Sequence, residues 1–219
     1  MKYIILDENK TATHKFKNGE GTFEWKDAKD FDNVGVMIPN KVIVLDFDSQ
    51  SDSEIMLKII EGENIPCKVM KTTRGIHVWL KSDNPWKNFK GSRLAAGIHA
   101  DCRSYGKSGY VKIKDKGSLR KFIRKCKLND MVKVPKWLYP VSSPADTFKF
   151  KNMESGQGRN QELFNYVVYL QSKEFTKDEI RECIRIINKY VFGDPLPEYE
   201  IKTILRDESF KSEEEIKCL

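Results

Sequence analysis

Short apolar runs, several alternating with polar residues, fill most of the first 140 positions of the chain, and this pattern is typical of β-strands. Strands are predicted at residues 3–6, 33–38, 41–48, 66–71, 76–81, 98–103 and 109–114. Pro39 and Asn40 form a turn signal between the second and third of these, which predicts an antiparallel hairpin. Residues 84–97 are expected to be partly helical.

Helical spacing of apolar residues marks a second group of segments. Residues 51–62 combine Ser51 and Glu54, in the form of a capping box, with Gly62 as a stop signal. Three further helices are expected at residues 159–173, 176–191 and 197–207. Thr176 and Glu179 offer a second capping box, and Pro197 fits a first helical position.

This order of elements predicts an α+β fold, in which a two-layer core on a largely antiparallel sheet precedes a small all-α helical bundle. Ser, Pro, Gly and Asn accumulate over residues 141–158, as in a linker. We therefore expect a first domain at residues 1–145, a linker at 146–158 and a helical domain at 159–219.

Charge is distributed unevenly along the chain, whose formal net charge is +7. Residues 1–150 contain 28 Lys and Arg against 18 Asp and Glu, whereas residues 151–219 contain 11 against 14. A basic excess confined to the first part suits a polyanionic partner such as a nucleic acid or a nucleoside triphosphate.

Other features of the composition exclude several classes of protein. The five cysteines lack a C-x-x-C pair, which argues against a disulfide framework or a structural zinc site. No apolar run is long enough to span a bilayer, and the charged N-terminus is no signal peptide. We expect no membrane partner and a cytoplasmic location in a microbial cell.

Two carboxylates stand out because they follow an apolar strand. Asp46 and Asp48 lie two positions apart and therefore project from the same face. Two close like charges repel each other unless a cation lies between them, and a divalent metal is the usual one. The pair could share one or two Mg²⁺ or Mn²⁺ ions.

Two later segments carry polar residues at strand positions. His77 shares a strand face with Trp79 and points away from the aliphatic face, and Arg74 and the small Gly75 precede it. A phosphate could approach there and accept hydrogen bonds from His77 and Arg74. Asp101 is a third carboxylate within a strand, on the same face as Arg103, two residues later.

One tempting motif fails. Gly106-Lys107-Ser108 looks like the end of a P-loop, but the earlier glycine that this motif requires would fall at Asp101. ATPase and helicase activity are therefore not expected.

The order of these motifs is more specific than any one of them. Asp46-x-Asp48, then Gly75-x-His77, then Asp101-x-Arg103 before Gly109-Tyr110-Val111 resembles the archaeo-eukaryotic primase superfamily, particularly the prim-pol domains of phages and plasmids. Residues 159–206 are similar to the helical domain that follows such catalytic cores. The turn after Arg103 is longer than the compact Gly-Gly of those relatives.

The resemblance implies a primase-polymerase (RRM-like) core and the activity of a DNA primase/polymerase, a nucleotidyltransferase of phage or plasmid replication. It also implies Mg²⁺ or Mn²⁺ as the cofactor, and as partners a single-stranded DNA template, NTP or dNTP, and a replicative helicase. The implied catalytic and metal-binding residues are Asp46, Asp48 and Asp101. The implied nucleotide-binding residues are His77, Arg74, Gly75, Arg103 and Lys112.

Two alternatives from other classes stay open. A metal-dependent nuclease could use the same carboxylates, because two-metal clusters also cut phosphodiesters. A non-catalytic module that binds single-stranded nucleic acid would need only the basic surface.

Overall fold

The computed structural model of the chain describes residues 1–16, 20–83, 86–105, 109–141, 145, 147–151 and 153–211. The chain divides into two compact units. The first unit comprises Met1–Ser53, Ile65–Lys90 and Asp101–Lys133. The second comprises Glu54–Asn64, Gly91–Ala100 and Val134–Leu219. The predicted domain boundaries at residues 145 and 159 stay a prediction.

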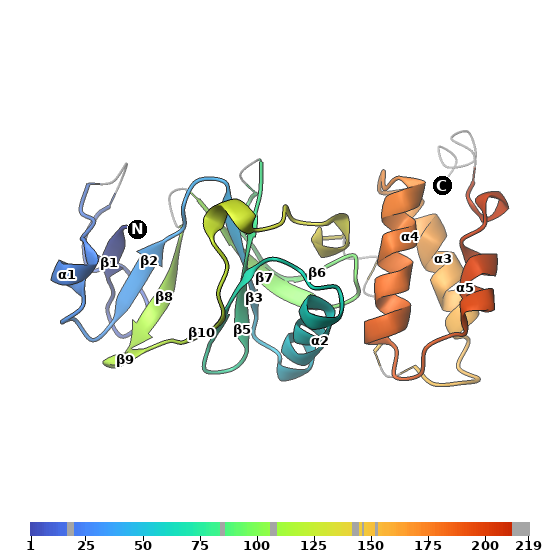
Figure 1. The fold of residues 1–219 in the computed structure, drawn as a ribbon, viewed down its shortest axis with the longest axis horizontal. Helices are drawn as coiled ribbons and strands as arrows, with labels where there is room; N and C mark the ends of the chain where they lie inside the picture. Colours follow the sequence, from blue (N-terminus) through green and yellow to red (C-terminus); the bar gives the residue numbers. More distant parts are fainter. Residues whose placement is uncertain are drawn as a thin grey trace. The chain divides into compact units, whose positions relative to one another are not determined.

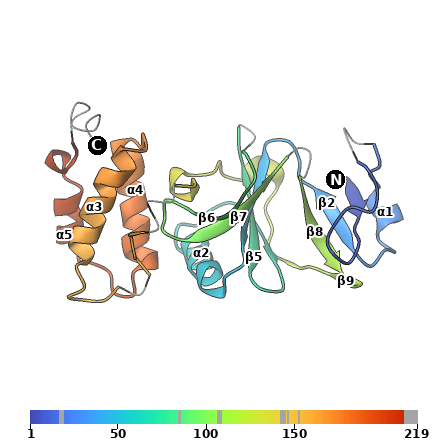
Figure 2. The same cartoon turned by 180° about the vertical axis from the view of Figure 1, so that it is seen from behind.

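The described strands form two β-sheets (Figures 1 and 2). The smaller has the order β1 (Tyr3–Ile5), β2 (Val34–Met37), β8 (Tyr110–Asp115), β9 (Ser118–Leu119). The larger has the order β10 (Phe122–Arg124), β4 (Lys68–Lys71), β5 (Ile76–Lys81), β3 (Val42–Phe47), β7 (His99–Ser104), β6 (Phe89–Arg93). The pairs β1–β2, β2–β8, β8–β9, β10–β4, β4–β5, β3–β5 and β3–β7 are antiparallel. The α+β fold class is thus confirmed, with two sheets in place of the one that was expected.

The predicted hairpin between β2 and β3 is wrong. β2 pairs with β1 and β8, and β3 pairs with β5 and β7, so the chain changes sheet between them. Ile38 still belongs to the smaller sheet, because its N–H donates to the carbonyl of Gly109 at 2.7 Å. Lys41, at a φ of 60°, then redirects the chain. Both neighbours of each strand are therefore distant in sequence.

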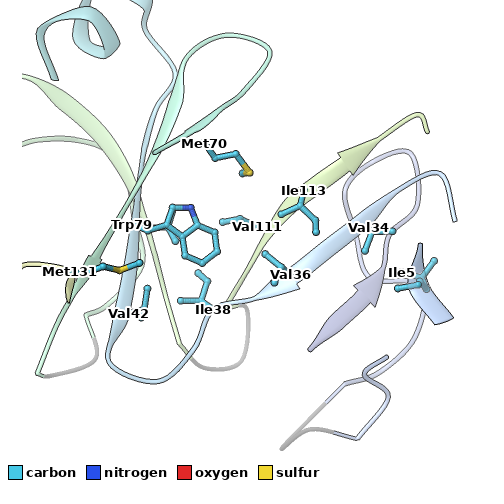
Figure 3. Close-up of a cluster of buried hydrophobic side chains, with 12 residues drawn as sticks. Ile5, Val34, Val36, Ile38, Val42, Met70, Trp79, Val111, Ile113 and Met131 are labelled. Carbon is cyan, nitrogen blue, oxygen red and sulfur yellow. The ribbon is translucent and has the colours of Figure 1, made fainter. Parts of the chain in front are cut away.

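A hydrophobic core joins the two sheets of the first unit. Figure 3 shows side chains from both sheets converging around Trp79 of β5, which is 1% exposed. Val42 of β3 lies on the same side, and Ile38 and Val111 approach from the smaller sheet. Burying these apolar groups in one layer stabilises the two sheets against each other.

Helix α2 (Gln50–Gly62) follows β3 and ends at Gly62, as predicted. The capping box at Ser51 is wrong, since Ser51 lies within the helix. The N–H of Asp52 instead donates to Oγ of Ser49 at 3.4 Å. The helix expected in residues 84–97 is also wrong, because the described part of that segment contains strand β6.

Three helices of the second unit lie side by side in both views (Figures 1 and 2), as the periodicity predicts: α3 (Arg159–Gln171), α4 (Lys177–Ile186), which a π-turn (Ile187–Val191) extends, and α5 (Glu198–Ile204). The capping box of Thr176 and Glu179 is present. Pro197 is the N-cap residue of α5, one position before the predicted one. In the described part of the chain, no helix is both long and apolar enough to cross a membrane.

A short helix, α1 (Trp25–Ala28), and three 3₁₀ turns complete the described elements. The turns are Leu128–Asp130, Lys136–Leu138 and Asp207–Ser209.

Candidate active site

Three neighbouring strands bring the acidic and histidine motifs into one row. Asp46 of β3 pairs with His77 of β5 on one side and with Asp101 of β7 on the other. Val44, two residues earlier, pairs with Trp79 and Arg103. Because side chains two positions apart share a face, the row continues the core face around Trp79. The buried apolar layer therefore gives way to charged groups at one end of the sheet.

The side chains of Asp46 and His77 lie within hydrogen-bonding distance of each other. Oδ2 of Asp46 lies 3.1 Å from Nε2 of His77, and the side chain of His77 is only 5% exposed. Oδ1 of Asp46 and Nδ1 of His77 are also buried, and neither has a hydrogen-bond partner. Burying a polar atom without a partner costs free energy, so a ligand that offers either atom a partner is favoured.

Asp48 has a different partner. It follows the last residue of β3, and its Oδ2 accepts a hydrogen bond from Nη2 of Arg74 at 2.9 Å. Both side chains are well exposed, at 49% for Asp48 and 69% for Arg74. An exposed ion pair of this kind is weak and readily exchanged.

The row has the chemistry of a divalent-cation site. Asp46 and Asp101 are opposite each other on adjacent strands, where like charges destabilise a sheet unless a cation neutralises them. The orphaned Oδ1 of Asp46 and the carboxylate of Asp101 are the hard oxygen ligands that Mg²⁺ and Mn²⁺ prefer. Among the described residues, however, no three His, Cys, Asp or Glu side chains form a ready metal cluster. Asp48 is turned to Arg74, so its participation would require that ion pair to open.

Gly75 contributes a close approach between two segments. A Cβ built on this residue would lie 1.8 Å from the carbonyl oxygen of Phe47 and 2.5 Å from Oγ of Ser53. The N–H of Gly75 also donates to Oγ1 of Thr72 at 3.0 Å, which closes the turn before β5. The small residue is therefore needed to pack the turn against the end of β3, and its predicted role in nucleotide binding stays a prediction.

A cleft of about 370 Å³ opens over this row. It contains most of the predicted site residues: Asp46, Asp48, Arg74, His77, Asp101, Arg103 and Lys112. The two sheets of the first unit both line it, since Lys112 comes from β8. The P-loop-like residues 106–108 lie outside the described residues.

The β8 side of the cleft is held by a cluster of charged residues. Nζ of Lys112 is buried and donates to Oδ1 of Asp115 at 2.7 Å and to Oδ1 of Asn33 at 3.0 Å. The hydrogen bond from Lys112 holds the pKa of Asp115 below its usual value of 3.8. Nη1 of Arg120 donates to the carbonyl of Lys112 at 2.9 Å. Lys112 is therefore an ion-paired residue of the cleft wall.

Sequence reasoning did not assign seven of the residues that line the cleft to the site, namely Lys10, Thr72, Thr73, Tyr110, Val111, Asp115 and Arg120. Thr72 and Thr73 could have been found, since they directly precede Arg74. The other five line the cleft because of how distant segments of the chain pack together, for which the sequence has no local pattern. Cys102 lies between two site residues, but burial raises the pKa of its thiol to about 12, so it offers no thiolate ligand.

A comparison with known protein families identifies the family of the chain. A family model described as "Bifunctional DNA primase/polymerase, N-terminal" matches residues 8–137, which include every described strand except β1 and all the residues that line the cleft. The chain belongs to the Prim-Pol family. This Prim-Pol chain is therefore a DNA primase/polymerase, an enzyme of the nucleotidyltransferase type, and its family is generally metal-dependent.

The match confirms the resemblance drawn from the motif order, and it accounts for the candidate partners in general terms, DNA and nucleotides. It ends before α3, so the kinship of the helical region with a primase helical domain stays a prediction. No curated protein matches the chain significantly.

Proposed function

We propose that this Prim-Pol chain synthesises primers on single-stranded DNA by two-metal nucleotidyl transfer. The observation that supports this most is the row of Asp101, Asp46 and His77, which pairs two opposed carboxylates with a buried imidazole at the mouth of a cleft. Such a row combines ligands for divalent ions with a donor for phosphate oxygens.

The acidic residues have one task in this proposal. Asp46, Asp48 and Asp101 would hold Mg²⁺ or Mn²⁺. The chemistry that two such ions would supply is to lower the pKa of the attacking 3′-hydroxyl and to neutralise charge on the triphosphate. The carboxylates thereby place positive charge where the negative charge of the transition state develops.

The cationic residues have the other task, which is to bind and orient the triphosphate. His77 and Arg74 border the carboxylates, and Arg103 lies on the same face two residues after Asp101. His77 is rigid because it is buried, whereas Arg74 is exposed and can move. We assign His77 to a fixed phosphate contact and Arg74 to one formed when Asp48 releases it.

In this proposal, the carboxylates exchange their contacts with Arg74 and His77 for contacts with divalent ions. Arg74 pairs with Asp48, and His77 contacts Asp46, until ions and a triphosphate replace both contacts. This exchange costs little at Arg74, because an exposed pair contributes at most about 1 kcal/mol. Divalent ions and nucleotide should therefore bind with positive coupling.

A phage or plasmid replication role and a replicative helicase as partner rest on the resemblance of the motifs and of residues 159–206 alone. The helical region could close over the primer's 5′ nucleotide or dock a helicase. Deleting residues 155–219 and assaying initiation separately from extension distinguishes them, because the first role predicts a selective loss of initiation.

De novo synthesis on unprimed single-stranded DNA tests the proposed function directly, with NTPs and dNTPs offered separately in Mg²⁺ or Mn²⁺. We expect the wild type to make primers and Asp101→Asn to make none, although both fold and bind DNA. Synthesis at the wild-type rate by Asp101→Asn would overturn the assignment.

A parallel incubation checks the nuclease alternative. End-labelled DNA is held with Mn²⁺ and the wild-type protein in the absence of nucleotides. We expect no shortening of the strand. Shortening that Asp46→Asn abolishes would instead assign the carboxylates to hydrolysis.

A further inference from the structure

A second groove of the first unit opens beside the cleft. It is formed by the end of β4, the β8–β9 turn, β9 and the start of β10, and its polar lining includes Lys71, Lys116 and Lys121. Leu119 and Ile123 also line it and are largely exposed, at 57% and 53%. The segment belongs to the most basic stretch of the chain, because residues 115–127 contain six Lys and Arg against one acid, Asp115.

The exposure of Ile123 follows from the strand that carries it. Phe122, its neighbour in β10, packs against Trp79 of the core, with ring centroids 6.2 Å apart. Since successive side chains of a strand point to opposite faces, Ile123 must face away from the core. Leu119 lines the same groove, so two large exposed aliphatic side chains lie together among lysines, and an apolar patch with a polar rim is typical of a binding surface.

The groove is continuous with the cleft. Thr72, Thr73, Asp115 and Arg120 line both of them. Arg120 is fixed at this junction, because Nη1 donates to the carbonyl of Lys112 and Nη2 lies 3.8 Å from Oδ2 of Asp115. A polymer that occupies the groove therefore reaches the carboxylate row without leaving the protein surface.

We propose that the groove along β9 and β10 holds the single-stranded DNA template as it enters the cleft. The lysines would contact successive phosphates, and Leu119 and Ile123 would contact base faces. Base faces are accessible only where bases are unstacked, so this chemistry selects a single strand over a duplex. The inference rests on the proposed function, since a strand that enters the cleft serves as a template only if the protein is a templated polymerase.

Two pairs of substitutions test the two components of this surface. Lys116→Gln/Lys121→Gln removes two charges from the groove, and Lys58→Gln/Lys202→Gln removes the same charge from exposed positions on α2 and α5. Leu119→Ser/Ile123→Ser removes apolar surface without changing the charge. Binding of a labelled single-stranded oligonucleotide is measured by fluorescence anisotropy over a range of salt concentrations, without nucleotide.

We expect the groove lysine pair to weaken binding about tenfold and to reduce the slope of log K against log salt by about 1.4, at about 0.7 for each phosphate that a lysine no longer neutralises. The serine pair should weaken binding with an unchanged slope, because the lysines still neutralise the same phosphates. The control pair should leave the slope of the wild type. A control pair that matches the groove lysine pair, or groove variants that bind like the wild type, would overturn the inference.

Primer synthesis by the wild type, measured in parallel, separates the two proposals. If the wild type makes primers while the groove variants bind DNA normally, the groove inference fails and the proposed function stands. If the wild type makes none while the groove variants still lose binding, the groove is a DNA-binding surface and the proposed function fails.

Discussion

Asp46 and His77 face each other across the β3–β5 ladder, with Oδ2 of the aspartate 3.1 Å from Nε2 of the histidine. The contact engages only one oxygen of the carboxylate and leaves Oδ1 buried without a partner. A single side chain thereby orients an imidazole and keeps a ligand atom available. This double use explains why Asp46 should be less replaceable than Asp48, which is exposed and paired only with Arg74.

Asp46→Asn tests that double use. The amide oxygen can still accept a hydrogen bond from His77, but the negative charge is lost, so we expect primer synthesis to fall at least about a hundredfold. Steady-state nucleotide incorporation measures the effect, and circular dichroism checks the fold. Asp30→Asn, at an exposed position, is the matched control. Incorporation above a tenth of the wild-type rate would contradict the role given to Asp46.

Arg74→Ala should separate the binding of ions from the binding of nucleotide. Without the guanidinium, Asp48 no longer has to break an ion pair, so Mn²⁺ alone should bind up to about fivefold more tightly. The triphosphate loses a donor and should bind more weakly. Isothermal titration calorimetry of each ligand, alone and with the other, measures both changes, with exposed Arg185→Ala as the control. Equal weakening of both ligands would refute the exchange.

Gly75→Ala should destabilise the protein because its Cβ would overlap the carbonyl oxygen of Phe47. We expect the free energy of unfolding in urea to fall by about 3 kcal/mol or more. Gly91→Ala is an informative comparison, since Gly91 has a φ of 56° but open space around it. Its cost should be limited to the backbone strain of about 1–2 kcal/mol. Equal costs at the two positions would contradict a steric role for Gly75.

Asp115→Asn should change how stability depends on pH. The hydrogen bond from Lys112 lowers the pKa of Asp115 in the folded protein, so the folded state binds this proton less readily than the unfolded state. The resulting stabilisation is fully present above pH 3.8 and is lost as pH falls through the lower folded-state pKa. Urea unfolding at several pH values should show Asp115→Asn less stable than the wild type at pH 6, by about 1–3 kcal/mol, because Lys112 is buried. The difference should shrink on acidification; a constant difference would refute the assignment.

The carboxylate row could be predicted from the sequence because its members are marked locally. Asp46 follows a run of apolar residues. In the strand that carries His77, side chains alternate between the two faces, so His77 lies on the opposite face from Ile76 and Val78. What no local pattern specified was the partner of each strand. β3 pairs with β5 along one edge and with β7 along the other, and both partners lie far from it in the chain.

Two of the errors, the hairpin and the missed cleft residues, have a common physical cause. The turn at Pro39 and Asn40 fits a hairpin locally, but β2 already has β1 and β8 as neighbours. Asp115 and Arg120 belong to the cleft only because the smaller sheet packs over the larger one. Both errors concern long-range sheet pairing, for which a single sequence carries no local signal.

The separation of β2 from β8 has a consequence for synthesis of the chain on the ribosome. Tyr110 emerges 73 residues after Met37, its partner in the ladder. At about 5–20 residues per second, β2 waits roughly 4–15 s for that partner. Until then the smaller sheet lacks β8, so Trp79, once synthesised, lacks Val111 and the core around it is incomplete. Nascent chains of this protein are therefore expected to need a chaperone most at this stage.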